Sequence, residues 1–183
     1  MTFALSKRGM WTTSFGLMML LLSAAHGSAD DEFLAGLRGG VSVYGGKDRF
    51  SQVEPFAAWR PPSCAWNFYS DWSLGGRLEG SAGWFNGQGA NAFIGTLGPV
   101  LEIRKGTFPL ILEGGSSPTV LSRHHFGTMN FGDDFQFTSH IGLRLEITKH
   151  FSIGWRFQHM SNAGMAHPNP GLNEQVISAS YGF

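Results

Sequence analysis

Alternating side-chain character constrains the fold of this chain more than any other feature. From Trp72 to Trp84, tryptophan, leucine and small residues occupy one phase, while Ser73, Arg77 and Glu79 fall in the other. Successive residues of a β-strand face opposite sides, so this segment predicts a strand with one apolar and one polar face. The same period of two runs from Phe135 to Ile147 and from Phe151 onward.

Eight segments of this kind follow one another, separated by clusters of glycine, asparagine, aspartate and proline that are typical of turns. The predicted strands are residues 33–44, 50–60, 72–84, 91–104, 107–117, 135–147, 151–157 with its continuation, and 173–183. Eight is the smallest common strand number of transmembrane β-barrels, and a tilted strand crosses a bilayer with about 9–11 residues. The predicted fold class is therefore all-β: an eight-stranded antiparallel transmembrane barrel of the outer membrane.

The N-terminal 29 residues have the organisation of a secretory signal peptide. Lys7 and Arg8 precede an apolar stretch that is densest at residues 17–22, and Gly27 and Ala29 suit a cleavage site. The apolar stretch is shorter than the ~20 residues that a membrane-spanning helix needs. We predict a signal peptide over residues 1–29 and a barrel domain over residues 30–183.

The charged residues distinguish two kinds of barrel. They make up only 14% of the chain, against ~25% in soluble domains. In a transmembrane barrel Arg77, Glu79 and Arg144 would pack in the lumen as mutually satisfied pairs. A soluble lipocalin-like barrel keeps the alternation but inverts the faces. The final strand favours the first alternative, because its ending with Tyr181 and Phe183 resembles the C-terminal signal of bacterial outer-membrane barrels.

Composition excludes other function classes. The chain has 13 basic and 13 acidic residues and no basic stripe, so no nucleic-acid partner is expected. A single cysteine, Cys64, excludes an internal disulfide and a cysteine-rich metal site. His124 and His125 lie in the longest predicted loop, residues 118–134, without an evident third ligand, and His167 is expected to be a solvated loop residue. We therefore predict neither a metal nor a cofactor.

Two polar residues continue the lipid-facing phase of the seventh strand. Phe151, Trp155 and Phe157 share this phase, and His159 and Ser161 follow in it. A polar pair facing acyl chains costs free energy, so residues placed against the local pattern are candidates for function. A serine hydroxyl becomes a nucleophile when a neighbouring imidazole takes its proton, which makes this pair a candidate ester-cleaving site.

The stretch from His159 to Gly171 reads H-x-S-N-A-G-x-x-x-P-N-x-G. It closely resembles the motif of the lipid A 3-O-deacylase family, the PagL-like outer-membrane barrels that hydrolyse the ester of the 3-linked hydroxyacyl chain of lipid A. The resemblance implies Ser161 as nucleophile and His159 as general base, with Asn162 and Gly164 helping to form an oxyanion hole. It also implies lipid A and outer-membrane lipids as partners, and the outer membrane of a Gram-negative bacterium as the location.

The chain departs from the family pattern at the acid position. The pattern places a glutamate two residues after the turn glycine, and this chain has Asn173 there, with Glu174 one place later. Counting back from Phe183 in steps of two puts Asn173 on the lipid face and Glu174 on the lumen side. We predict Asn173 as the residue that orients His159, with Glu174 as the second candidate if a bulge shifts the register.

Other functions for a small barrel stay open at this level. A non-catalytic structural or adhesive barrel would have the same strands, and so would another lipid-modifying barrel such as an acyltransferase or a phospholipase. A homodimer is also open. The deacylase is the function that the motif favours.

Overall fold

The computed structural model describes residues 33–43, 49–62 and 64–183. The predicted signal peptide, residues 1–29, lies outside the described residues, so its boundary stays a prediction. The described strands are β1 (Phe33–Ser42), β2 (Phe50–Trp59), β3 (Ala65–Tyr69), β4 (Trp72–Gly87), β5 (Ala90–Lys105), β6 (Leu110–Leu121), β7 (His125–Phe126), β8 (Met129–Asn130), β9 (Phe135–Glu146), β10 (Phe151–Ser161) and β11 (Leu172–Gly182).

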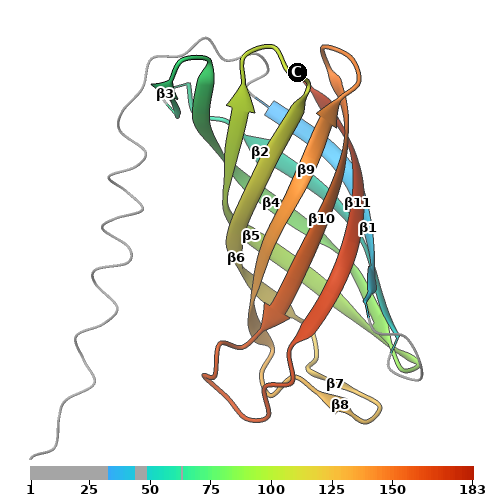
Figure 1. Ribbon diagram of the computed structural model, residues 1–183. Coiled ribbons are helices and arrows are strands. Elements are labelled where there is room, and N and C mark those ends of the chain that lie inside the picture. Colours follow the sequence, from blue (N-terminus) through green and yellow to red (C-terminus); the bar gives the residue numbers. More distant parts are fainter. Residues whose placement is uncertain (1–32, 44–48, 63) are drawn as a thin grey trace, which may run out of the picture.

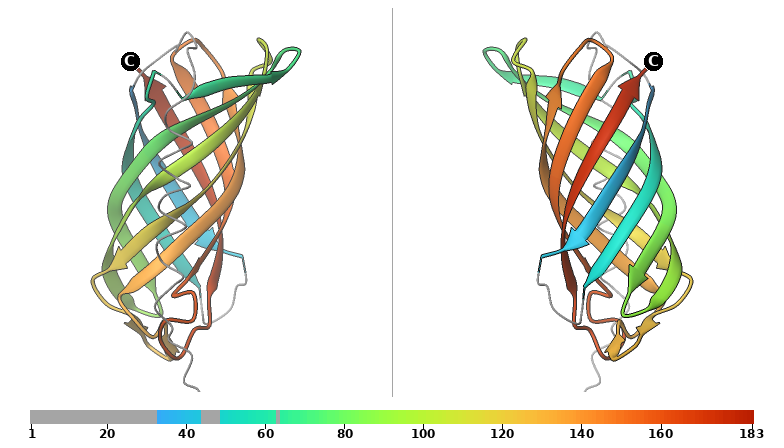
Figure 2. Two further views of the ribbon diagram at one scale, coloured as in Figure 1. Left: turned by 90° about the vertical axis from the view of Figure 1, so that its left-hand side faces the viewer. Right: turned by 90° about the vertical axis from the view of Figure 1, so that its right-hand side faces the viewer.

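Eight of these strands close into an antiparallel barrel (Figure 1, Figure 2). The order around the wall is β1, β2, β4, β5, β6, β9, β10 and β11, and the last strand pairs with the first from Leu34 opposite Gly182 to Ser42 opposite Glu174. The predicted eight-stranded barrel is thus confirmed. The loops at residues 122–134 and 162–171 lie together at the end opposite the C-terminus, which we call the loop end (Figure 1).

The structure adds three short strands that the sequence pattern did not predict. β3 pairs with the first residues of β4, and the two strands reach beyond the barrel wall at the end where the C-terminus lies (Figure 2). β7 and β8 form a small hairpin inside the loop that was predicted over residues 118–134. That prediction was wrong at its start, because β6 continues to Leu121. Pro118 has no N–H group to donate, but Thr119 and Val120 still pair with β9.

The two faces of the wall have the polarity of a transmembrane barrel. Outward residues are large and apolar, with Trp84 63% exposed and Ile141 59% exposed, whereas inward residues such as Arg77 and Glu79 are each 4% exposed. This arrangement excludes the soluble alternative, in which the apolar face would be buried. In the ranges that the structure describes, no helix is long and apolar enough to cross a membrane.

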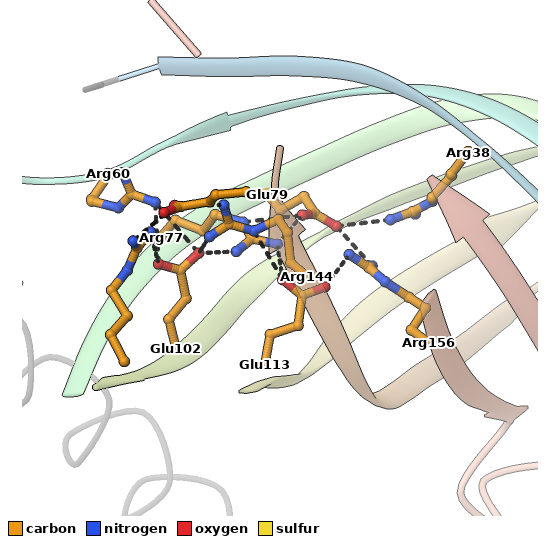
Figure 3. Close-up of polar contacts among 10 residues, drawn as sticks. Arg38, Arg60, Arg77, Glu79, Glu102, Glu113, Arg144 and Arg156 are labelled. Atoms are coloured by element: carbon orange, nitrogen blue, oxygen red, sulfur yellow. Dashed lines mark hydrogen bonds and ion pairs between the residues drawn. The ribbon is translucent and has the colours of Figure 1, made fainter. Parts of the chain in front are cut away.

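A network of ion pairs lies inside the barrel (Figure 3). Arg77 lies between Glu79, Glu102 and Glu113, and Arg156 bridges Glu79 at 2.9 Å and Glu113 at 3.1 Å. Further pairs of the same network join Arg38 to Glu54 and Glu79, Arg60 to Glu102, and Arg144 to Glu102. Because each buried guanidinium meets at least one carboxylate, the charges predicted for the lumen are mutually compensated.

Apolar side chains fill the lumen at the loop end. Four phenyl rings, Phe50, Phe85, Phe126 and Phe131, contact one another with all six centroid distances between 5.3 and 6.3 Å. Inward residues of the last two strands, among them Met160 and Leu172, belong to the same cluster. The ends of β10 and β11 therefore rest on a packed core and not on a water-filled channel.

Candidate active site

His159 and Ser161 lie at the loop end of β10 and face outward. Their neighbours Gln158 and Met160 are buried in the lumen, at 3% and 1% exposure. His159 is exposed and Ser161 is half-buried. The alternation of β10 therefore holds without a bulge up to Ser161, and the structure places both side chains on the face that the sequence predicted.

Asn173 is the direct cross-strand neighbour of His159. The two residues are paired in the register of β10 and β11, and His159 Nδ1 lies 2.8 Å from Asn173 Oδ1. A carbonyl oxygen only accepts, so this contact assigns the ring proton to Nδ1. Nε2 of His159 is then left with its lone pair, which is the state that a general base requires.

Glu174 lies on the opposite side of the wall. Its side chain is fully buried in the lumen, where Gln158 Nε2 donates to one carboxylate oxygen at 2.9 Å. Its hydrogen-bond partner in the lumen is therefore an amide group. Because β11 has no bulge at this position, Glu174 points away from His159.

His159 and Ser161 stand two residues apart on one strand, and no hydrogen bond joins them among the described residues. Ser161 is registered with Phe137 of β9. Hydrogen bonds between catalytic groups are often long before a substrate is bound and shorten in the complex. The arrangement thus supplies a hydroxyl and an imidazole on one face, with the imidazole already oriented.

Asn162 begins the loop that follows β10, and its side chain turns inward with no exposed surface. Its Nδ2 group donates to the carbonyl oxygens of Phe131, Ala166 and Pro168 at 2.9, 3.0 and 3.2 Å. Its Oδ1 atom accepts the Gly164 N–H at 2.9 Å. Asn162 therefore ties the loop of residues 162–171 to itself and to the neighbouring loop.

Asn162 and Gly164 are the residues expected to help form the oxyanion hole, and the backbone N–H groups of both are engaged in this conformation. Gly164 N donates to Asn162, and Asn162 N donates to Asn169 Oδ1 at 3.1 Å. Asn169 is a residue for which the sequence suggested no role, although it is part of the motif. Its oxygen is held by the backbone, which orients its NH₂ group and makes it a further candidate donor.

The remaining histidines of the loop end do not join the site. His167 is exposed in the loop after β10, and His124 contacts Asp134 at 2.7 Å. Within the described part of the chain, no group of three histidine, cysteine or carboxylate side chains is arranged to hold a metal.

Known proteins resemble this chain in sequence as well as in architecture. Residues 54–182 match the family described as lipid A 3-O-deacylase (PagL). A lipid A deacylase PagL of Bordetella bronchiseptica is 31% identical over 174 residues, which cover 92% of this chain and 94% of that protein. The chain belongs to the lipid A 3-O-deacylase (PagL) family. The matched range contains His159, Ser161 and Asn173.

A second relative agrees with this assignment, and a solved structure shares the fold. The lipid A deacylase PagL of Pseudomonas aeruginosa is 30% identical over 123 residues, covering 62% of this chain and 71% of that protein. A crystal structure of the outer membrane enzyme PagL superposes with a TM-score of 0.66 at 22% identity, over 82% of this chain and 99% of the other. The predicted fold is confirmed, and the apolar outward face of the barrel agrees with the location in the outer membrane that was predicted with it.

Proposed function

We propose that this chain hydrolyses the 3-linked acyl ester of lipid A in the outer leaflet, with Ser161 as nucleophile and His159 as general base. The observation that carries the proposal is the contact between His159 Nδ1 and Asn173 Oδ1 at 2.8 Å, two residues from an outward serine. A hydroxyl, an oriented imidazole and an orienting side chain on one face are the parts of a serine esterase. The family and its named relatives support lipid A as the substrate.

The reaction proceeds in two steps. Ser161 Oγ attacks the ester carbonyl carbon while its proton passes to His159 Nε2, and the bond from that carbon to the sugar oxygen then breaks. The proton on His159 goes to the departing sugar oxygen. Water, activated in the same way by His159, cleaves the acyl-enzyme and releases the fatty acid. Asn173 holds the ring in its tautomer throughout, without adding a negative charge.

Donors to the developing oxyanion come from the loop after β10. The NH₂ group of Asn169 is oriented by the Asn162 N–H, as described above. Asn162 and Gly164 contribute their own N–H groups if the substrate displaces the contacts within the loop. One such donor is typically worth ~3–4 kcal/mol of transition-state stabilisation.

The acyl chain lies along the outer wall below the nucleophile. Phe157 and Trp155 face outward on β10, at 36% and 44% exposure, and Ile141 lies beside Phe157 on β9. These surfaces are apolar and contact membrane lipids in the same way as they would contact a substrate chain. The substrate is thus held from the membrane side and needs no closed pocket.

Mass spectrometry of lipid A from cells that express the chain tests this function. We expect loss of one hydroxyacyl mass with the natural sequence and no loss with Ser161→Ala, whose barrel should still show heat-modifiable migration on gels. An added acyl mass would identify an acyltransferase, and unchanged lipid A would identify a non-catalytic barrel. Undiminished loss with Ser161→Ala would reject the serine mechanism.

A further inference from the structure

A row of polar residues crosses the outer wall at the level of His159. Ser116 of β6 is registered with Ser139 of β9, Ser139 with His159, and His159 with Asn173. The hydroxyls of Ser116 and Ser139 lie 2.9 Å apart. The two serines thus extend the candidate active site by two strands, on the side of His159 away from Asn173.

On β6 and β9, the serine pair lies among apolar outward residues. In the described strands β6 and β9, every other residue of the outward phase lacks a polar side chain. On β9 these residues are Phe135, Phe137, Ile141, Leu143 and Leu145, and on β6 they are Leu110, Leu112, Gly114, Pro118 and Val120. A hydroxyl that faces hydrocarbon without a partner costs free energy. Contact with membrane lipid alone therefore does not explain why Ser116 and Ser139 lie on this face.

The serine pair satisfies only part of its own hydrogen-bonding capacity. Each hydroxyl is one donor and an acceptor of two bonds, and the contact between them uses one donor. One O–H group and several lone pairs are left on the lipid side. Both serines are exposed, and the neighbours of Ser139 along the strand, Phe137 and Ile141, provide no polar partner. A polar atom of a lipid can fill this place.

We propose that Ser139 and Ser116 bind a hydroxyl on the third carbon of the acyl chain that is being released. This inference rests on the proposed function, which puts the ester carbonyl at Ser161. The serine row lies two residues deeper along the strands, ~6.8 Å toward the C-terminal end. The third carbon of an acyl chain stands about 2.5 Å beyond the carbonyl in the same direction, and its C–O bond with one O–H···O hydrogen bond of ~2.8 Å spans about 4 Å more. Neighbouring strands are ~4.8 Å apart, so a chain lying between β9 and β10 brings this hydroxyl to Ser139.

The consequence is selectivity for the acyl chain. An acyl chain with the hydroxyl supplies the hydrogen bonds that the serine pair lacks. An acyl chain without the hydroxyl leaves the two serines facing hydrocarbon. Sites built to pair with a substrate hydroxyl discriminate against the analogue that lacks it. Ser139 and Ser116 are in this sense specificity-determining residues, separate from the groups that transfer the proton.

The experiment compares two lipid A substrates that differ only in the 3-linked chain, 3-hydroxytetradecanoyl or tetradecanoyl. With the natural sequence we expect kcat/KM to be about five- to tenfold higher for the hydroxylated chain, the worth of one hydrogen bond. Ser139→Ala and the double variant with Ser116→Ala should bring the two values within about twofold of each other, by slowing only the hydroxylated substrate. Gln175→Ala is the matched control, because Gln175 is an exposed polar residue of β11 on the other side of His159.

Equal rates on the two substrates with the natural sequence would overturn the inference, and so would a preference that survives the double variant. A loss of rate on both substrates alike, in a barrel that still shows heat-modifiable migration, would also overturn it. These results leave the proposed function standing. Failure to release either chain would instead overturn the proposed function, and this inference with it.

Discussion

Gly171 lies directly against the imidazole ring of His159. A β-carbon added at Gly171 would stand 2.8 Å from His159 Cε1 and 3.4 Å from Nε2. The backbone of Gly171 has a φ of +67°, a conformation that favours glycine. The glycine that ends the motif therefore both makes the turn into β11 and leaves room for the ring of the proposed base.

Gly171→Ala should displace this ring and lower kcat by tenfold or more, since a misplaced base loses about 1.4 kcal/mol or more of transition-state stabilisation. The rate of fatty-acid release from lipid A measures the effect. Gly89→Ala is the matched control: Gly89 has a φ of +78° at the same end of the barrel, and its added β-carbon would meet no atom within 4 Å. An equal loss in both variants would attribute the effect to backbone strain and not to His159.

Asn173→Ala should lower kcat by about tenfold, because His159 loses the hydrogen bond that fixes its tautomer. Asn173→Asp should raise kcat above that of the natural sequence, because a carboxylate stabilises the imidazolium formed during attack. Kinetics on purified, refolded barrels would measure both effects.

Glu174→Gln separates the two candidates for the orienting residue. Glu174 faces the lumen, so its substitution should leave kcat within about twofold of the natural value. A loss of activity as large as that of Ser161→Ala would assign the orienting role to Glu174 and reject Asn173.

Asn162→Ala should loosen the loop of residues 162–171 while the barrel stays folded. The substitution leaves three carbonyl oxygens and the Gly164 N–H without their partner, and each such buried group costs about 1–3 kcal/mol. We expect faster proteolytic cleavage of this loop and at least tenfold slower fatty-acid release. Asn91→Ala, at an exposed position near the β4–β5 turn, should change neither measurement.

Glu79→Gln should destabilise the barrel by about 3–5 kcal/mol, because it removes the one carboxylate that three buried guanidinium groups share and leaves their charge only partly compensated. Glu79 contacts Arg38, Arg77 and Arg156 and is 4% exposed. Glu146→Gln is the control: that side chain is 36% exposed, and exposed ion pairs are worth about 0–1 kcal/mol. Urea unfolding of both variants in lipid vesicles measures the difference, and equal midpoints would contradict the ranking.

The sequence by itself determined which residues form the wall and which way each of them faces. Side-chain period is a local property of a strand, so Trp84 could be assigned outward and Arg77 inward without any knowledge of their neighbours. The same alternation predicted that His159, Ser161 and Asn173 lie together on the outer face. It also separated Glu174 from them, because a shift of one residue reverses the face.

Only the tertiary structure decided which residues meet across strands and between loops. The register that sets Ser116 beside Ser139, and Ser139 beside His159, depends on pairings between distant segments that no local pattern encodes. The contact from Asn162 to the carbonyl of Phe131 joins two loops 31 positions apart. Other contacts within the loop after β10 engage the backbone N–H groups of Asn162 and Gly164, the two residues that the motif had suggested for the oxyanion hole. The face on which a side chain lies follows from the local alternation along its strand. The register between strands follows from the closure of the whole barrel.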